Sequence, residues 1–262
     1  MAYQSLDLSV SDGLARLVLN QPEIGNPFNA EFCAEWAQVA NELAERKDVR
    51  AILITAAGKF FSVGGDIGMF SKNLDVLPGK IREWTTGLHM GTARMARLDA
   101  PIVVAVHGVC MGGACALIAG CDLVFSGKSA KFGAAYSQIG YSCDAGASVT
   151  LTSRMGVARA RRFLMLAEML DAQKATDIGL VDELVDDDVL MEAAEKAAIK
   201  LSKGPTRAYG EIRRLFAKAT SQSFEAQLED EAQALSQVAA SEDAREGITA
   251  FVEKRKAEFK GR

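Results

Sequence analysis

Features that often reveal a function are scarce in this chain of 262 residues. It has two histidines, and its five cysteines include no Cys-x-x-Cys pair, so no metal site is expected. The cysteines are expected to stay reduced and to pack as small apolar residues. No apolar run reaches the roughly 18 residues that a membrane-spanning helix requires. The composition therefore argues against metal-dependent, disulfide-stabilised and transmembrane proteins.

An excess of charge is also missing. Lysine and arginine number 30 against 34 aspartates and glutamates, and the net charge of −4 is spread along the chain. Because no basic cluster is combined with aromatic residues, binding to nucleic acid is not expected. Residues Met1 to Gln4 lack the basic and apolar segments of a signal peptide, so we expect a cytoplasmic protein. With 49% hydrophobic residues, the chain can bury one large core or a core plus a small second unit.

Strands and helices are predicted to alternate over the first 200 residues. Apolar runs predict strands, and apolar residues at helical spacing predict helices. Asn29 is the expected N-cap of the first helix, and Asp12-Gly13 predicts a hairpin turn. The strands are expected at 6–10, 14–19, 51–56, 102–106 and 122–125, and the helices at 29–46, at about 79–97 and directly after residue 113. This order predicts an α/β protein.

From about residue 201 the pattern changes to helices alone. Pro205 precedes three segments with helical periodicity, around 207–219, 223–240 and 241–259, and no strand signal separates them. Amphipathic helices need a surface against which to bury their apolar faces. We therefore divide the chain into a core of residues 1–200 and a helical C-terminal region of residues 201–262.

Two glycine-bearing turns are the most informative motifs, and each directly follows an apolar strand. The first is Ser62-Val63-Gly64-Gly65-Asp66, and the second is Met111-Gly112-Gly113-Ala114. Glycine lets a backbone N–H group approach a ligand closely, and a helix N-terminus adds unpaired donors. Two such donors on separate turns could hold one oxyanion. Ordinary strand-to-turn glycines would give the same spacing.

The two turns resemble the oxyanion-binding loops of the crotonase superfamily, also called the enoyl-CoA hydratase/isomerase family. The similarity covers nearly the whole chain. The further segments that match are Asn20-Gln21-Pro22-Glu23, Asn26-Pro27-Phe28-Asn29, Cys121-Asp122-Leu123-Val124, Ser129-Ala130-Lys131-Phe132-Gly133 and Ala250-Phe251-Val252-Glu253-Lys254-Arg255.

The resemblance implies a fold, an assembly and a substrate. The fold is a right-handed spiral of ββα turns with a C-terminal helical trimerisation region. The assembly is a homotrimer, or a hexamer made of two trimers. The N–H groups of Gly65 and Gly113 would bind the thioester oxygen of an acyl-CoA substrate, with no cofactor beyond the CoA moiety itself.

The catalytic positions depart from those of the best-known members. Hydratases of the family use two glutamates, and the matching residues here are Ala116 and Tyr136. Addition of water needs one group to deprotonate the water and an acid to supply the α-proton, and alanine can do neither. A two-glutamate hydration is therefore not expected. The family's 3,2-enoyl-CoA isomerases keep the second glutamate, so Tyr136 differs from their usual site too.

Asp144 supplies a carboxylate eight residues after Tyr136, where the hydratases have glycine. Three branches carry aspartate at this position: dienoyl-CoA isomerases, 1,2-epoxyphenylacetyl-CoA isomerases and 4-chlorobenzoyl-CoA dehalogenases. By this resemblance Asp144 is the catalytic carboxylate. The alternative is that Asp144 only caps a helix beginning near Ala145, since aspartate is a favoured N-cap.

His89 and Tyr136 match the dehalogenase branch as well. His89 lies where those enzymes carry the histidine that activates the hydrolytic water, and Tyr136 lies where a tryptophan hydrogen-bonds the nucleophilic aspartate. Each can also be structural, as a helix histidine that is satisfied or faces solvent and as a packed aromatic with its hydroxyl at the surface. His107 is interpreted as a structural residue that stabilises a turn.

Three functions are consistent with these residues. In an isomerase, the two N–H groups would stabilise an enolate while Asp144 moves a proton. In a hydrolytic dehalogenase, Asp144 would attack the ring carbon of an aroyl-CoA, and His89 would activate water as the base. A chain without both glutamates could also be a non-catalytic acyl-CoA binder. We favour the isomerase, because the dehalogenases commonly carry a bulky aromatic at the position of Gly65.

The CoA moiety is expected to bind residues carried over from the family. The backbone around Val63, Asp66 and Ile67 and the loop with Asn26 and Phe28 would form the adenine and pantetheine side. Phe251 and Lys254 of a neighbouring subunit would lie near the adenine and the phosphates. The alternative for these two residues is one face of an amphipathic helix.

Overall fold

The chain opens with a hairpin whose turn is set by two residues. In the computed structural model, which describes residues 3–262, β1 (Leu6–Ser11) pairs antiparallel with β2 (Leu14–Leu19). Asp12 and Gly13 both have positive φ, at 50° and 78°, as a type I′ turn requires. The hairpin predicted from Asp12-Gly13 is confirmed.

Two sheets form the body of the protein. Within residues 3–262, the main sheet has the strand order β1-β2-β3-β4-β6-β9, and every pair after the hairpin is parallel. A smaller sheet has the order β5-β7-β8, with β7 antiparallel to β8. The remaining strands are β3 (Ala51–Ala56), β4 (Ile102–Val106), β5 (Val109–Met111), β6 (Leu123–Gly127), β7 (Lys131–Gly133), β8 (Met169–Asp171) and β9 (Glu183–Val185).

Helices follow most of the strands, as the α/β pattern of the sequence predicts. They are α1 (Ala30–Glu45), α2 (Ile67–Ser71), α3 (Leu77–Met95), α4 (Gly113–Ala119), α5 (Ala147–Met155), α6 (Val157–Met165), α7 (Ala172–Asp177), α8 (Leu190–Ser202), α9 (Thr206–Lys218), α10 (Phe224–Ala239) and α11 (Glu242–Val252). Asn29 caps α1 by accepting the Phe32 N–H at 2.9 Å, as expected. In the described part of the chain, none of these helices is both long and apolar enough to cross a bilayer.

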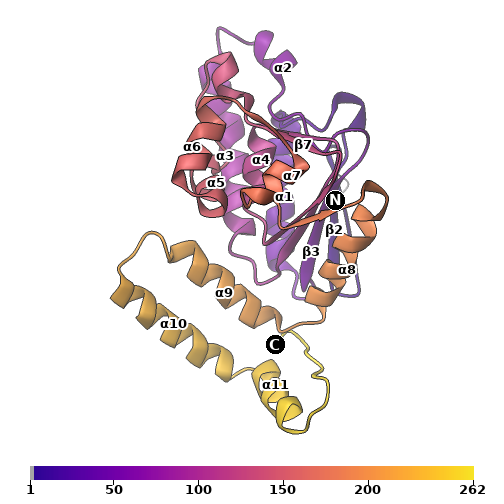
Figure 1. Cartoon of the computed structure of the whole chain (residues 1–262), viewed down its shortest axis with the longest axis vertical. Helices are drawn as coiled ribbons and strands as arrows, with labels where there is room; N and C mark the ends of the chain where they lie inside the picture. The colour runs from indigo at the N-terminus through magenta and orange to yellow at the C-terminus, as the bar shows by residue number, and fades with distance from the viewer. Residues whose placement is uncertain (1–2) are drawn as a thin grey trace.

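Both faces of the main sheet are covered (Figure 1). α1 and α4 pack in the larger core on one face, and α8 packs on the other. Successive side chains of β3 point to opposite faces of the sheet. Ile52 and Ile54 join the larger core, whereas Leu53 joins the smaller core with Ala194 of α8. Strands buried on both faces are continuously apolar, which makes 51–56 and 102–106 recognisable in the sequence. The α/β class is confirmed, and the handedness of the predicted spiral stays a prediction.

The last predicted helix ends earlier than expected. α11 stops at Val252, so the expectation of a helix through residue 259 is wrong. Lys254 has a φ of 56°, and the Arg255 N–H donates to Ala250 O at 3.0 Å, a left-handed helix end. The chain then turns back, because the Asp243 carboxylate accepts the N–H groups of residues 260 and 261. Lys254 therefore does not lie on a helix face.

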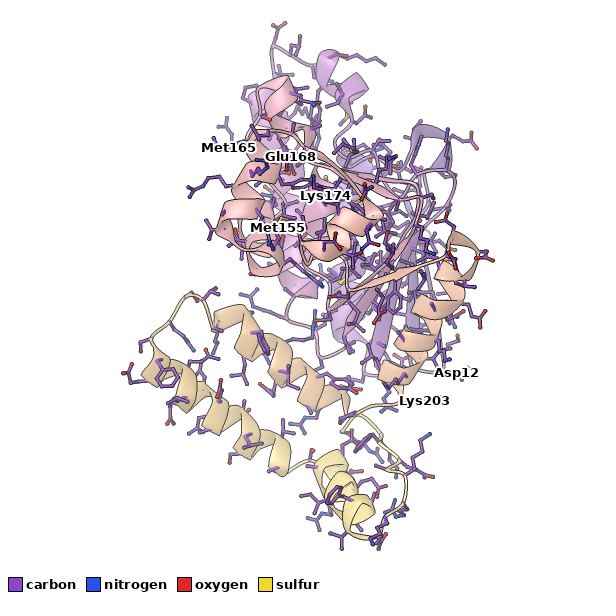
Figure 2. All side chains as sticks on the ribbon, in the orientation of Figure 1. Asp12, Met155, Met165, Glu168, Lys174 and Lys203 are labelled. Atoms are coloured by element: carbon purple, nitrogen blue, oxygen red, sulfur yellow. The ribbon has the colours of Figure 1, made fainter. Side chains whose placement is uncertain are left out.

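The three C-terminal helices extend away from the body (Figure 1). Side chains crowd together in the body, whereas many on α9, α10 and α11 stand apart from any neighbour (Figure 2). The exposed large apolar side chains here are Ile212, Phe216, Phe224, Leu228, Leu235, Ile248, Phe251 and Val252. A single chain thus leaves much of this region's apolar surface in water.

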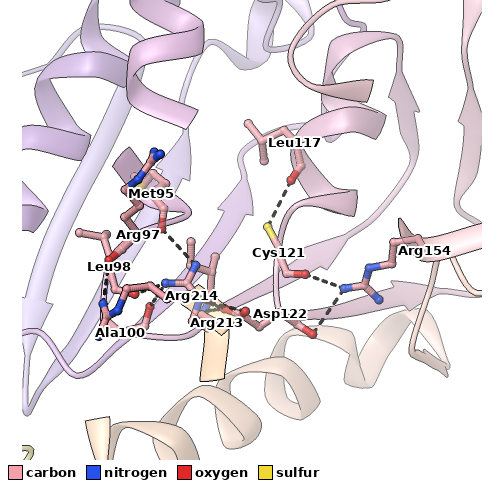
Figure 3. Close-up of polar contacts among 11 residues, drawn as sticks. Met95, Arg97, Leu98, Ala100, Leu117, Cys121, Asp122, Arg154, Arg213 and Arg214 are labelled. Atoms are coloured by element: carbon pink, nitrogen blue, oxygen red, sulfur yellow. Dashed lines mark hydrogen bonds and ion pairs between the residues drawn. The ribbon is translucent and has the colours of Figure 1, made fainter. Parts of the chain in front are cut away.

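One buried arginine joins α9 to the body (Figure 3). The Arg213 side chain is 8% exposed, and its Nε lies 2.9 Å from Oδ2 of Asp122. Asp122 in turn accepts the N–H of Ile102 at 2.6 Å, at the start of β4. The guanidinium also donates to three main-chain carbonyl oxygens, that of Met95 at the end of α3 and those of Leu98 and Ala100 in the segment that leads to β4. Arg213 therefore ties α9, α3 and β4 together.

We expect Arg213→Gln to lower the free energy of unfolding by about 2 to 4 kcal/mol, because it leaves a partly buried carboxylate and several carbonyls without their donor. Urea unfolding at fixed protein concentration measures this. Arg214→Gln is the matched control, since Arg214 is 34% exposed and pairs with Asp99 and Glu211 at the surface. Its expected cost is below about 1 kcal/mol. Equal losses for both variants would contradict the prediction.

Candidate functional site

The two glycine turns lie side by side at the edge of the smaller sheet. Ser62 forms a parallel bridge with Cys110, the central residue of β5, through Ser62 N to Val109 O and Met111 N to Ser62 O, both 3.0 Å. Gly65 and Gly113 each lie three residues beyond this bridged pair. A Cβ atom on Gly64 would lie 2.9 Å from Met111 O, too close for any side chain. The register of the bridge therefore brings the two turns together.

Both predicted oxyanion donors are available. In the described part of the chain, neither the Gly65 N–H nor the Gly113 N–H donates a hydrogen bond to another residue. Gly113 is the first residue of α4, where no intrahelical acceptor exists for its N–H. Gly65 pairs with Phe28 in a bridge that uses the neighbouring Gly64 O, which accepts the Phe28 N–H at 2.7 Å. Both glycines line one cavity.

That cavity has a volume of about 640 Å³ and lies between α2, α3, the glycine turns and the loop before α5. Its walls are mostly apolar and aromatic. The lining includes the large side chains of Phe28, Phe70, Leu77, Ile81, Trp84, Leu88, Tyr136 and Tyr141. Asp144 is the one charged residue among those described as lining it. Any charge that develops here is poorly screened, so Asp144 and the two N–H groups dominate the electrostatics.

Asp144 and Tyr136 form a direct pair. The Tyr136 hydroxyl donates to Oδ1 of Asp144 at 2.7 Å. Burial and the neighbouring carboxylate raise the pKa of Tyr136 far above its usual value, so the phenol stays a neutral donor. A Cβ atom on Gly113 would lie 3.6 Å from the same Oδ1, which places the carboxylate beside the oxyanion donor. The predicted Asp144–Tyr136 contact is therefore present.

The capping alternative for Asp144 is wrong. α5 begins at Ala147 rather than near Ala145, and its N-cap is Gly146, with no side-chain cap. The side chain of Asp144 is turned toward Tyr136 instead. Asp144 thus has no helix end to stabilise with its carboxylate.

The residue that matches the first glutamate of the family's hydratases, Ala116, is buried. Ala116 is fully buried in α4, and its carbonyl oxygen accepts the Thr150 hydroxyl at 3.0 Å. The buried Cys33 thiol also lines the cavity, a residue that the sequence did not single out. Burial and the Asp144 charge raise its pKa to about 12, so it stays a neutral thiol. Neither residue supplies a second acid or base.

Three aromatic rings form a wall that the sequence did not reveal. The Phe70 ring lies 6.0 Å from the ring of Trp84 and 6.0 Å from that of Tyr141, with interplanar angles of 9° and 21°. The rings come from α2, α3 and the loop before α5. Because the contact joins separate elements, no spacing along the chain announces it.

His89 does not join the cavity. It is exposed on α3 and is not one of the residues that line the space around Asp144. Its Nε2 accepts the backbone N–H of Ala145 at 3.2 Å. The lone pair that would take a proton from water is therefore already engaged. His107 contacts the main-chain oxygen of Gly58 at 2.9 Å, consistent with its structural interpretation.

The predicted CoA residues divide into three groups. Phe28, Val63 and Ile67 line the cavity. Asn26 points inward instead: its amide donates to two carbonyl oxygens and accepts the Gln21 N–H, so its side chain braces the loop. The Asp66 carboxylate caps α2, since its Oδ1 accepts the Met69 N–H at 2.8 Å. Phe251 lies on α11 and Lys254 just after it, in the region that extends away from the body (Figure 1). Neither residue lines the cavity of its own chain.

Comparison with known proteins identifies the family of this chain. The family described as Enoyl-CoA hydratase/isomerase matches residues 9–262. The chain belongs to the enoyl-CoA hydratase/isomerase family. It is 32% identical over 259 residues to the 1,2-epoxyphenylacetyl-CoA isomerase of Escherichia coli K12, with 97% of each chain covered. It is also 32% identical over 262 residues, 100% of both chains, to a probable enoyl-CoA hydratase of Rhodobacter capsulatus.

The fold agrees with this membership. The crystal structure of an enoyl-CoA hydratase from Polaromonas sp. JS666 has a TM-score of 0.91 to this chain at 27% sequence identity, covering 97% of this chain and 99% of that one. The enoyl-CoA hydratase/isomerase family accounts for an α/β body with a helical C-terminal region. Its relatives include both isomerases and hydratases, so the catalytic side chains must decide the reaction.

We expect Tyr136→Phe to lower kcat about 10-fold or more, because hydrogen bonds to charged groups contribute about 1.5 to 3 kcal/mol and this one orients the carboxylate. Steady-state kinetics on an accepted enoyl-CoA measures the effect. Tyr141→Phe is the matched control, since Tyr141 lines the same cavity and contributes a stacked ring. If both variants lose the same activity, the Tyr136–Asp144 hydrogen bond has no special role.

Proposed function

We propose that this protein is an isomerase of acyl-CoA thioesters in which Asp144 is the base and the N–H groups of Gly65 and Gly113 stabilise the enolate. One observation carries the proposal: a single carboxylate, hydrogen-bonded by Tyr136, lines the cavity beside two unpartnered N–H groups. An isomerase needs one group that removes a proton and returns it elsewhere, and one carboxylate suffices for that.

The reaction would proceed in two proton transfers. Asp144 removes a proton from the carbon next to the thioester, or from the vinylogous carbon, and the electron pair moves into the carbonyl oxygen. The two N–H groups donate to that oxygen, and preorganised donors of this kind contribute about 3 to 4 kcal/mol each. The protonated Asp144 then returns the proton to another carbon of the same conjugated system. Atoms and charge balance without a co-reactant.

The other reactions fit the residues less well. Hydration needs a second acid, and the matching position is the buried Ala116. The dehalogenase mechanism needs His89 as a base, and its Nε2 already accepts the Ala145 N–H outside the cavity. A non-catalytic binder has no need of a carboxylate oriented by a tyrosine toward the ligand space.

The lining also restricts the acyl group. The cavity presents aromatic and aliphatic side chains, and among the described residues no lysine, arginine or histidine lines it. A carboxylate at the far end of an acyl chain would lose its water there without gaining a partner, which is costly. The proposed substrates are therefore uncharged, apolar acyl groups that pack against Trp84, Phe70 and Tyr141.

A neighbouring copy would complete the CoA site. The exposed apolar side chains of α9, α10 and α11 need a cover, and a homotrimer or a hexamer of two trimers would provide one. In this assembly Phe251 and Lys254, both exposed here, would reach the adenine and phosphates of CoA bound to the next subunit.

The isomerase proposal is tested by Asp144→Asn. The wild type should exchange α- or γ-protons of an enoyl-CoA in deuterated buffer, and the variant should lose at least about 100-fold in kcat while still binding CoA. The change keeps the size of the side chain and an oxygen that can accept from Tyr136. Full activity of the variant on every accepted substrate would refute Asp144 as base.

The substrate class is tested with two thioesters of equal chain length, one ending in a methyl group and one in a carboxylate. We expect kcat/KM to be at least about 100-fold lower for the carboxylate, because its charge must be desolvated without a partner. Both compounds share the CoA moiety, so the difference reports on the acyl group alone. Comparable values would show that the cavity tolerates charge.

A further inference from the structure

Asp144 stands at the start of a tight turn. The Ala147 N–H donates to Asp144 O at 2.9 Å, and the two central residues, Ala145 and Gly146, have φ values of 53° and 86°. This is the geometry of a type I′ turn. Gly146 adopts it freely, whereas an alanine rarely does. The turn that presents the carboxylate is therefore held in a conformation that its own sequence does not favour.

The backbone N–H of Ala145, the first central residue of this turn, is buried and needs a hydrogen-bond acceptor. Ala145 is 1% exposed and packs within the larger core. In a type I′ turn the N–H of the first central residue points away from the turn, so the turn itself offers it no acceptor. A buried donor without a partner is strongly disfavoured. Some neighbouring element must therefore accept the Ala145 N–H.

His89 is that acceptor. Its Nε2 lies 3.2 Å from Ala145 N, across from α3 to the loop. Since the backbone N–H can only donate, we assign the imidazole as neutral, with its proton on Nδ1. Two neighbouring residues of the turn are thus fixed by different partners. Tyr136 hydrogen-bonds the Asp144 carboxylate, and His89 hydrogen-bonds the backbone N–H of Ala145.

We propose that His89 is a positioning residue that fixes the strained turn at Ala145 and so aims the Asp144 carboxylate. It acts through the Ala145 N–H and touches no substrate. The inference rests on the proposed function, because aiming the carboxylate matters to turnover only if Asp144 is the base. A general base would need its free nitrogen in the cavity, whereas this nitrogen faces the backbone outside it.

Two substitutions at residue 89 separate the possibilities. His89→Gln keeps a neutral acceptor of similar reach, and His89→Leu keeps bulk without an acceptor. We expect His89→Leu to lower kcat about 10- to 100-fold with KM changed less than about 3-fold, since small misplacements of a reacting group cost that much. His89→Gln should restore kcat to within about 3-fold of the wild type. Met90→Leu, at an exposed neighbouring site on α3, is the control and should match the wild type.

Either of two kinetic results would overturn the proposal. If His89→Gln loses as much as His89→Leu, the imidazole itself takes part in the reaction. If His89→Leu keeps full activity, the hydrogen bond does not position Asp144.

A second measurement does not depend on activity. Hydrogen exchange of the backbone should accelerate at residues 144–147 in His89→Leu and stay slow in His89→Gln. Acceleration spread over the whole chain would indicate general destabilisation and would contradict a local positioning role. If Asp144→Asn stays fully active, the proposed function fails, yet this exchange pattern still reports whether His89 holds the turn.

Discussion

The site depends on the contact between two glycine turns that follow neighbouring strands. Residue 64 can approach the main chain of Met111 only because it has no side chain, since a Cβ atom there would lie 2.9 Å from a carbonyl oxygen. The parallel pairing of Ser62 with Cys110 then sets the register of the two turns. Two backbone N–H groups can share one ligand atom only if that register holds. The cavity, the carboxylate and the aromatic wall are all arranged around this contact.

The apolar lining of the cavity strengthens the electrostatic interactions of its few polar groups. One carboxylate faces a mostly apolar space, and its Oδ1 accepts a hydrogen bond from a phenol that the same environment keeps neutral. In apolar surroundings charges interact more strongly than they do in water. In the proposed reaction, a small number of fixed donors would therefore direct where negative charge develops in the substrate. Ala116 and Tyr136 stand at the positions of the family's two glutamates, so Asp144 is the one carboxylate among the described residues that line the cavity.

α3 connects three parts of the molecule. Trp84 and Leu88 form a wall of the cavity, and His89, one residue further, accepts the N–H of Ala145 in the loop that carries Asp144. The carbonyl oxygen of its last residue, Met95, accepts a hydrogen bond from Arg213 of α9. One helix thus contacts the ligand space, the loop that carries Asp144 and the C-terminal region. Its sequence has helical periodicity, but the three partners come from distant parts of the chain.

The sequence by itself determined the class and most of the elements. Continuous apolar runs predicted β3 and β4, and the Asp12-Gly13 turn and the Asn29 cap were confirmed because each depends on residues within a few positions. The two glycine turns were recognisable because each directly follows an apolar strand, whereas the catalytic interpretation of Asp144 came from the resemblance to a known family. The structure then excluded the capping role of Asp144, since α5 begins later.

Only the tertiary structure decided what depends on distant residues. It joined Trp84, Phe70 and Tyr141 into one wall, turned Asn26 inward and directed His89 to the backbone of Ala145. It also ended α11 at Val252, where a returning tail pairs with Asp243. Periodicity and caps report on forces between residues close in sequence. Hydrogen bonds and ring contacts across the fold join residues that only the folded chain brings together, so no local pattern encodes them.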